Sequence, residues 1–318
     1  NPAIVNNAET FAHVPSIVRA GAASFRSLGT ADTPGTLLFT VSGDVKRPGV
    51  YELEAGVTLR SLLDDTAGGP REGRRFKAVL AGVASAVITP EQFGVKTDFG
   101  SMKLIGSGLG SCGFVVVDDS TSMPRVLQSI ARFLYVESCN QCSACKAGLR
   151  SASEAIDEIF DAATASEDDV PRALYGALSA PQGNRCYLPV QGSIVIPNLI
   201  RRFADELDAQ RTHPEQAPPP FLIPKLVDFD PASRTFTLDG RQARKTPDWT
   251  YDGEPSEAES SPTSMRPAPR PVDADCAPVA VRLAPDVANA VAARARDNNL
   301  AVEVVVNDAL RSWLRGAE

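Results

Sequence analysis

Apolar and polar residues alternate in four short segments near the start of the chain, and this period predicts β-strands. The segments are 37–42, 50–53, 76–80 and 114–117. Between the second and the third, Thr58 can cap a short helix whose Leu59, Leu62 and Leu63 would point inward. A hairpin, a helix and two further strands have the size of a small domain, so the pattern predicts a β-grasp domain over residues 36–120.

The apolar period becomes helical in the next part of the chain. Helical spacing occupies the segments 124–134, 147–160, 168–178 and 197–207. These segments predict a four-helix bundle over residues 121–212, and the fold class expected for the chain is therefore α+β. An earlier helical stretch begins near Glu9 and contains Pro15, which predicts a kink or a helix start at that position.

Proline dominates the following segment. Thirteen of the 25 prolines lie between Pro214 and Pro278, so residues 213–277 are expected to be a linker with a short hairpin. Residues 278–318 show a strand followed by two helices, as in a ribbon–helix–helix unit, which pairs two copies through their strands. The stretch 277–318 holds five Arg and five Asp or Glu, and a neutral module releases few counterions from DNA. We therefore expect self-dimerisation or docking through residues 278–318 rather than nucleic-acid binding.

Composition narrows the function classes. The 318 residues are enough for two or three domains, and 43% of them are hydrophobic. No apolar run approaches the roughly 20 residues that a membrane-spanning helix needs. The net charge of −7 argues against nucleic-acid binding by the chain as a whole.

Cysteine spacing is the strongest chemical signal. Cys139, Cys142 and Cys145 follow a C-x-x-C-x-x-C pattern, and Cys186 comes after 40 intervening residues. One compact run with a remote fourth thiolate favours a [4Fe–4S] cluster, because structural zinc sites more often use two separated pairs. A zinc site, or a disulfide with spare thiols, are the alternatives. Six cysteines in 318 residues, without a secretion signal, argue against disulfides.

Four stretches of the chain resemble the C-terminal part of the NADH-binding flavoprotein (F) subunit of respiratory complex I, a family shared with NAD-linked hydrogenases and formate dehydrogenases. They are residues 1–10, 42–51, 106–118 and 137–148. The resemblance covers about residues 1–210. It implies that the strands form an SLBB domain, a ubiquitin-like β-grasp, and that the helical bundle binds iron and sulfur. It also implies that residues 1–35 are the end of a truncated FMN- and NADH-binding domain.

The resemblance implies a role in electron transfer. In this family NADH reduces FMN, and single electrons then leave through a [4Fe–4S] cluster. The cluster ligands that the resemblance implies are Cys139, Cys142, Cys145 and Cys186. The FMN contacts that it implies are Asn6, Asn7 and Thr10. From the residues alone, Asn6-Asn7 is better interpreted as a polar turn that caps a helix.

The resemblance also implies what surrounds this chain. The full-length subunit would be an NADH dehydrogenase, with FMN and NAD(H) bound largely outside the present residues and a quinone or another molecule as acceptor. Its partners would be other electron-transfer subunits, such as a [2Fe–2S] protein. We expect a cytoplasmic protein, peripheral to the inner face of the membrane and attached only through partners. The alternative is a non-enzymatic iron–sulfur or zinc scaffold with a C-terminal dimerisation or DNA-binding module.

The sequence departs from the family pattern around the cysteines. The family has Gly between the first two cysteines, Thr-Pro between the next two, and Arg-Glu after the third. Here these positions hold Asn140, Ser143-Ala144 and Lys146-Ala147. The family's Leu-Gly-Asp after the fourth cysteine is replaced by Leu188-Pro189-Val190. These changes keep all four thiols, indicate a divergent branch and leave its redox partner open.

Overall fold

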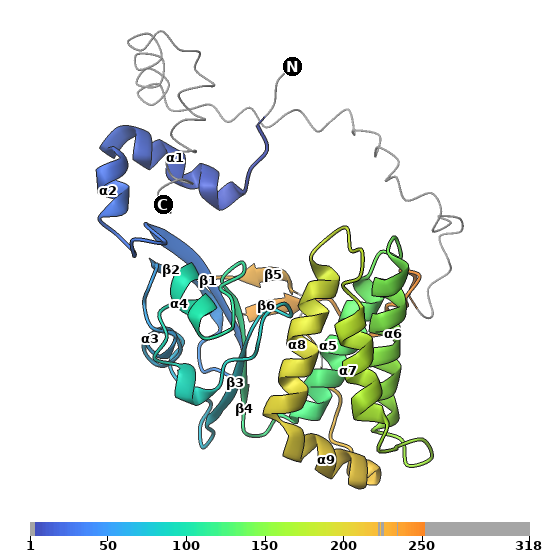
Figure 1. Ribbon diagram of the computed structural model, residues 1–318. Coiled ribbons are helices and arrows are strands. Elements are labelled where there is room, and N and C mark those ends of the chain that lie inside the picture. The colour runs from blue at the N-terminus through green and yellow to red at the C-terminus, as the bar shows by residue number, and fades with distance from the viewer. Residues whose placement is uncertain (1–3, 222, 224–225, 234, 252–318) are drawn as a thin grey trace.

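The computed structural model describes residues 4–221, 223, 226–233 and 235–251 (Figure 1). Within these residues a four-stranded sheet lies beside a group of helices, so the fold is mixed α/β. The expected combination of a sheet followed by helices is confirmed.

The sheet consists of β1 (Thr36–Gly43), β2 (Gly49–Glu54), β3 (Phe76–Ala81) and β4 (Gly113–Asp118). Its order is β2-β1-β4-β3, with β1 antiparallel to β2 and parallel to β4, and with β3 antiparallel to β4. All four strands lie where the alternating pattern predicted them. Gly43 ends β1 with a φ of 89°, and a Cβ there would lie 2.1 Å from the Val116 carbonyl oxygen. Only glycine can adopt this backbone conformation so close to the Val116 carbonyl.

Short helices pack on one face of the sheet. They are α3 (Leu59–Ser61), the π-helix η1 (Leu62–Thr66), the 3₁₀ turn η2 (Pro90–Gln92) and α4 (Phe99–Leu104). The predicted cap at Thr58 is confirmed, because its hydroxyl oxygen accepts a hydrogen bond from the Ser61 amide at 3.1 Å. Leu59, Leu62 and Leu63 are fully buried, as their spacing predicted.

The other face of the sheet packs on the longer helices. In β3, Ala78 and Leu80 belong to the core shared with these helices, whereas Val79 and Ala81 belong to the core under the short helices. Successive residues of a strand point to opposite faces, so β3 contributes to both cores. The sheet is therefore the middle layer, and the bundle is built directly on it.

Five helices form the bundle in the described residues: α5 (Met123–Glu137), α6 (Ser143–Glu158), α7 (Asp169–Ser179), α8 (Leu188–Arg202) and α9 (Ala204–Thr212). Helices α6 and α7 approach most closely where two glycines face each other. A Cβ on Gly148 would lie 2.5 Å from the Gly176 carbonyl oxygen, and a Cβ on Gly176 would lie 2.6 Å from that of Gly148. This contact sets how closely α6 and α7 can pack.

The start of α8 corrects a prediction, because the sequence pattern placed a helix start at Pro197. Instead α8 begins at Leu188 with Pro189 in its first turn, and Pro197 lies buried inside it. Proline inside a helix costs roughly 3 kcal/mol relative to alanine. The buried side chains of Val195, Ile196 and Leu199 continue the apolar face on both sides of Pro197, so tertiary packing offsets this cost.

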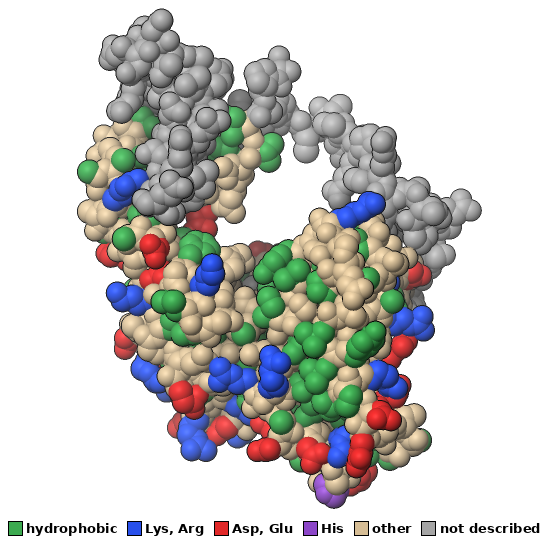
Figure 2. Space-filling view, viewed as in Figure 1, with side chains coloured by type: hydrophobic (Ala, Val, Ile, Leu, Met, Phe, Trp, Pro, Cys, Tyr) green, Lys and Arg blue, Asp and Glu red, His purple; other side chains and the backbone are tan. Residues whose placement is uncertain are grey.

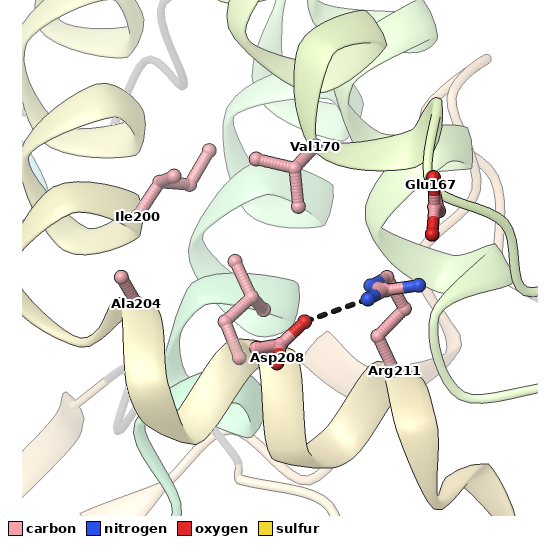
Figure 3. Close-up of a pocket in the computed structure, with 7 residues that line it drawn as sticks. Glu167, Val170, Ile200, Ala204, Asp208 and Arg211 are labelled. Atoms are coloured by element: carbon pink, nitrogen blue, oxygen red, sulfur yellow. Dashed lines mark hydrogen bonds and ion pairs between the residues drawn. The ribbon is translucent and has the colours of Figure 1, made fainter.

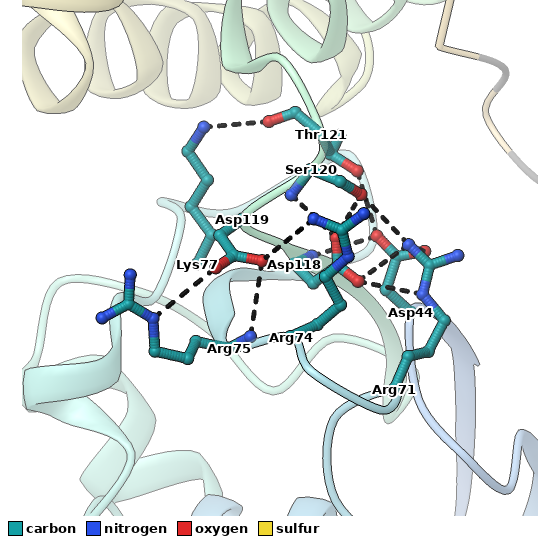
Figure 4. Close-up of polar contacts among 9 residues, drawn as sticks. All are labelled: Asp44, Arg71, Arg74, Arg75, Lys77, Asp118, Asp119, Ser120 and Thr121. Atoms are coloured by element: carbon teal, nitrogen blue, oxygen red, sulfur yellow. Dashed lines mark hydrogen bonds and ion pairs between the residues drawn. The ribbon is translucent and has the colours of Figure 1, made fainter.

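A polar network joins the ends of the strands to the segment that leads into α5 (Figure 4). Arg71 donates two hydrogen bonds, of 2.9 and 2.7 Å, to the buried Asp118 carboxylate, and pairs with Asp44 at 3.2 Å. Lys77 of β3 forms an ion pair of 2.8 Å with Glu206 of α9. Since β4 leads into α5 through this network, the position of α5 is set by the sheet.

Two helices precede the sheet and stand apart from the bundle (Figure 1). Helices α1 (Ala8–Ala20) and α2 (Ala22–Arg26) contain no buried residues. Pro15 lies inside α1 rather than at its start. The main tie between α1 and the sheet is a hydrogen bond of 2.7 Å from the Leu38 amide to the Glu9 carboxylate.

The segment after the bundle contains a second, two-stranded sheet. Strands β5 (Leu226–Asp230) and β6 (Thr235–Leu238) pair antiparallel, between the 3₁₀ turns η3 (Pro214–Gln216) and η4 (Gln242–Arg244). The ribbon–helix–helix tail expected at 278–318 lies outside the described residues. Among the described helices, none has the length and apolar character needed to cross a membrane.

Gly148→Ala should lower the free energy of unfolding by about 1–3 kcal/mol, because the added methyl group must separate α6 from α7. Alanine is the better helix former, so a loss of stability isolates the packing effect. Urea unfolding followed by circular dichroism measures it. Gly94→Ala is the control, since a Cβ there meets nothing within 4 Å. Equal stability of the two variants would contradict the close approach of α6 and α7.

Candidate functional site

The three motif cysteines lie where α5 ends and α6 begins. Cys139 follows the end of α5 and is partly buried. Cys142 is the N-cap residue of α6, and Cys145 lies buried in the first turn of that helix. Asn140 has a left-handed backbone conformation with a φ of 60°, which asparagine tolerates better than most residues. The resulting tight turn gathers three thiols at the amino end of one helix.

The fourth cysteine comes from another part of the bundle. Cys186 lies exposed in the loop between α7 and α8, one residue before the N-cap of α8. The pKa of the Cys145 thiol is raised to about 11, first by burial and then by the charges of Cys186, Cys142 and Cys139. Charges shift a pKa in this way only from nearby. Cys186 therefore lies within electrostatic reach of Cys145.

The donor set matches a soft metal centre in chemistry. The five cysteines within the described ranges are free thiols, and thiolates are the preferred ligands of iron–sulfur clusters and of zinc. In the same ranges, no group of three or more His, Cys, Asp or Glu is arranged to hold a metal ion. Cys139, Cys142, Cys145 and Cys186 are four such donors. Ligation also has to displace the proton that the raised pKa keeps on Cys145.

The amino end of α6 is suited to negatively charged sulfur. The first N–H groups of a helix lack intrahelical partners, and the helix dipole is positive there. Lys146 adds a partly buried ammonium group within electrostatic reach of Cys145 and Cys139, and burial lowers the pKa of this lysine. The sequence pattern indicated Lys146 only as a departure from the family. The sequence signal for a role of Lys146 was its position directly after Cys145.

Comparison with known proteins identifies two regions. The SLBB domain matches residues 38–88, and the NADH-ubiquinone oxidoreductase-F iron-sulfur binding region matches residues 125–210, which contain all four cysteines. The NADH-quinone oxidoreductase F 2 subunit of Rhizobium meliloti (strain 1021) is 47% identical over 150 residues, or 47% of this chain and 36% of the relative. The NADH-quinone oxidoreductase F subunit of Rickettsia rickettsii (strain Sheila Smith) is 34% identical over 216 residues, or 66% of this chain and 50% of the relative.

A solved structure is also similar to this chain. An NAD+-reducing [NiFe]-hydrogenase in the H2-reduced state matches with a TM-score of 0.58 and 31% identity, over 66% of this chain and 35% of that chain. Over the matched residues, this chain is similar to the NADH-quinone oxidoreductase F subunit. The resemblance found in the sequence is confirmed. The present chain spans half or less of the length of these two F subunits, 36% and 50%.

One departure from the F-subunit pattern has a structural explanation. Where the family has glycine between the first two cysteines, this chain has Asn140 with a positive φ. Glycine and asparagine are the residues that most readily adopt this conformation. The replacement therefore preserves the turn that separates Cys139 from Cys142.

The residues for which the sequence resemblance implied FMN contacts lie at the start of α1, away from the bundle (Figure 1). The Asn7 side-chain oxygen accepts hydrogen bonds from the amides of Glu9 and Thr10 at 2.8 and 3.3 Å, so the helix cap expected from the residues alone is confirmed. Asn6 accepts one from the Asn7 amide at 2.7 Å. The structure does not bring Asn6, Asn7 or Thr10 to the cysteines.

A cavity of about 300 Å³ lies between α7, α8 and α9, near the carboxyl end of α8 (Figure 3). It is lined by Glu167, Val170, Ile200, Ala204, Leu207, Asp208 and Arg211. The walls are mainly apolar, and Arg211 and Asp208 at the rim pair with each other at 2.7 Å. Figure 2 shows hydrophobic and charged side chains side by side on this face of the bundle. None of the sequence-predicted site residues lines this cavity.

In the metal-free chain at pH 8, iodoacetamide should label Cys186 far faster than Cys145. The thiolate is the reactive form, and a pKa of about 11 keeps Cys145 protonated at this pH. As the pH is raised toward that pKa, the labelling rate of Cys145 should increase about tenfold per pH unit. Peptide mass spectrometry measures both rates. Buried Cys112, whose pKa burial raises to about 12, is the internal slow reference, and equal labelling of Cys145 and Cys186 at pH 8 would contradict this environment.

Proposed function

We propose that this chain is the electron-transfer part of an NADH:acceptor oxidoreductase flavoprotein subunit. In this proposal it holds a [4Fe–4S] cluster through Cys139, Cys142, Cys145 and Cys186. The observation that carries the proposal is the position of the three motif cysteines at the junction of α5 and α6, with Cys186 inside the same region that matches the F-subunit iron–sulfur family. The relatives, which are named as NADH-quinone oxidoreductase subunits, support an oxidoreductase function, and we propose this activity for the whole subunit.

The ligands come from two separate places in the bundle. Cys142 and Cys145 are positioned by the first turn of α6, and Cys139 by the turn at Asn140. Cys186 is positioned by the packing of α7 and α8. A bound cluster passes one electron at a time, whereas a flavin accepts two together. The amides at the start of α6 and the Lys146 ammonium would favour the more negative, reduced form.

We assign the sheet to a β-grasp domain of the SLBB type over residues 36–120, and the helices to an iron–sulfur bundle over residues 121–212. The parallel β1–β4 pair flanked by two antiparallel partners and the SLBB match at 38–88 support this assignment. The role of the β-grasp domain would be to brace the bundle, which the Lys77–Glu206 ion pair supports. Residues 213–277 would be a linker, and 278–318 a dimerising tail.

FMN and NAD(H) would bind in the full-length protein, and Asn6, Asn7 and Thr10 would contribute to the FMN site from residues 1–35. Asn7 uses its side-chain oxygen as a helix cap, which leaves its amide NH₂ group able to donate to a ligand. The amino end of α1 also favours a phosphate. The next carrier would be another electron-transfer subunit such as a [2Fe–2S] protein, in a cytoplasmic complex peripheral to the inner face of the membrane.

Cys142→Ser should abolish most cluster binding in the anaerobically reconstituted chain. Wild type should contain about four irons and four sulfides per chain and give an S = 1/2 EPR signal after reduction, as a cluster with four cysteine ligands does. Iron and sulfide analysis with low-temperature EPR measures this.

Cys276→Ser is the control, because Cys276 lies outside the four-cysteine set. It should load like wild type. An iron content that is unchanged in Cys142→Ser would remove Cys142 from the ligand set. Stoichiometric zinc without an EPR signal in wild type would replace the cluster by a zinc site.

A further inference from the structure

Two stretches beyond the iron–sulfur region, which ends at residue 210, return to the bundle and lie along α5. We call residues 214–221 and 242–251 the strap. Its contacts with α5 are hydrogen bonds from Arg125 to the Pro218 carbonyl (2.8 Å), from Ser129 to the Phe221 carbonyl, from Arg132 to the Lys245 carbonyl (2.9 Å) and from Trp249 to the Val136 carbonyl (2.8 Å). The strap therefore runs from the amino end of α5 to its carboxyl end.

These contacts occupy one face of α5. The four helix residues are spaced by four, three and four positions, which places them in one row along a helix. The strap also adds apolar packing, because Phe221 packs against the bundle core. Because these contacts extend over about three turns of one helix face, the strap is a packing partner of α5 within the segment that joins the bundle to the rest of the chain.

The strap ends where the cysteine loop begins. The last carbonyls of a helix have no intrahelical partners. In α5, the buried Val136 carbonyl accepts from the Trp249 indole at 2.8 Å. Lys146 donates to the carbonyls of Tyr135, Ser138 and Pro247 at 3.1, 3.1 and 3.0 Å. This one lysine therefore links the end of α5, the start of α6 and the strap.

An ion pair also joins the strap to the carboxyl end of α5. The Lys245 ammonium donates to both carboxylate oxygens of Glu137 at 2.8 Å, and these side chains are 12% and 24% exposed. It also lies 5.5 Å from the centre of the Trp249 ring, within the range of a cation–π contact. Glu137 is two residues before Cys139, so the pair acts on the segment that carries the first cysteine.

The turn that presents Trp249 is itself organised. The Thr246 amide donates to the Thr250 carbonyl at 2.9 Å, and the Thr246 and Thr250 hydroxyl groups lie 2.7 Å apart. Trp249 has a φ of 71°, which a bulky side chain adopts only where its surroundings impose it. The strap thus holds its tryptophan in a conformation that serves the contact with α5.

We propose that Lys245 and Trp249 of the strap are positioning residues that clamp the cysteine loop and protect its cluster. The clamp holds residues 135–139 in place, whereas Cys186 lies exposed in the loop between α7 and α8. Loss of the clamp frees Cys139 to leave the cluster, so the cluster becomes more labile although all four thiols remain. This proposal rests on the cluster of the proposed function, whereas the clamp itself is a property of the metal-free chain.

The test uses Trp249→Phe, which keeps an aromatic ring and removes the indole N–H, and Lys245→Met, which removes the charge. In the metal-free full chain, hydrogen exchange of the amides in 135–146 should be about fivefold faster in each variant, the factor that one hydrogen bond of ordinary net strength contributes. In the loaded chain, an iron chelator should bleach the cluster absorbance several-fold faster, and the EPR line shape of the reduced cluster should change.

Two controls separate clamping from general destabilisation. Lys245→Arg keeps the charge and should restore wild-type bleaching, because arginine can pair with both oxygens of Glu137. Val227→Ala, at a 64% exposed position of β5 between the two stretches of the strap, should leave exchange and bleaching unchanged.

These measurements test the clamp separately from the presence of the cluster. Wild-type exchange, bleaching and EPR line shape in Trp249→Phe and Lys245→Met would overturn the clamp. Equal acceleration by Val227→Ala would overturn it as well, because the effect would then be general. If wild type takes up no iron, the proposed function fails, and hydrogen exchange in the metal-free chain still decides whether the strap clamps the loop.

Discussion

The carboxyl end of α5 is the constraint on which the candidate site depends. A helix leaves its last carbonyls without partners, and here Lys146 and Trp249 supply the missing donors. The cysteine loop starts directly after this helix end, so satisfying the helix end also sets where the loop begins. Because Lys146 belongs to the first turn of α6, the same lysine sets where the loop ends. A loop whose two ends are held by one partly buried cation has little freedom to misplace its thiols.

The fourth cysteine depends on packing rather than on hydrogen bonds. Helix α7 lies close against α6 at Gly148 and Gly176, and α8 starts just after Cys186, so the packing of these helices determines where Cys186 lies. The bundle in turn is built on one face of the sheet, which the Lys77–Glu206 ion pair holds in place. The sheet domain therefore contributes to the site without providing a ligand.

Much of this arrangement follows from local sequence patterns. Alternation predicted all four strands of the larger sheet, and Thr58 predicted its cap, because both depend on neighbouring residues only. The start of α8 was predicted wrongly, since Pro197 is acceptable inside a helix only when tertiary packing compensates, and no local pattern reports that. The cysteine spacing predicted a metal centre, yet the strap could not be foreseen. The hydrogen bonds that Arg125, Arg132 and Trp249 donate between α5 and the strap have main-chain carbonyls as acceptors, and any residue supplies a carbonyl, so the residue types do not indicate the pairing.

The proposed role of the cysteines is that four thiols from two loops surround one polynuclear centre. Iron-edge X-ray absorption of the anaerobically loaded chain tests this most directly, because it reports the atoms around the metal without reference to activity. The predicted result is a first shell of sulfur only, with a second shell of neighbouring iron atoms. A spectrum without an iron–iron shell, or with nitrogen and oxygen in the first shell, would contradict a cluster held by Cys139, Cys142, Cys145 and Cys186.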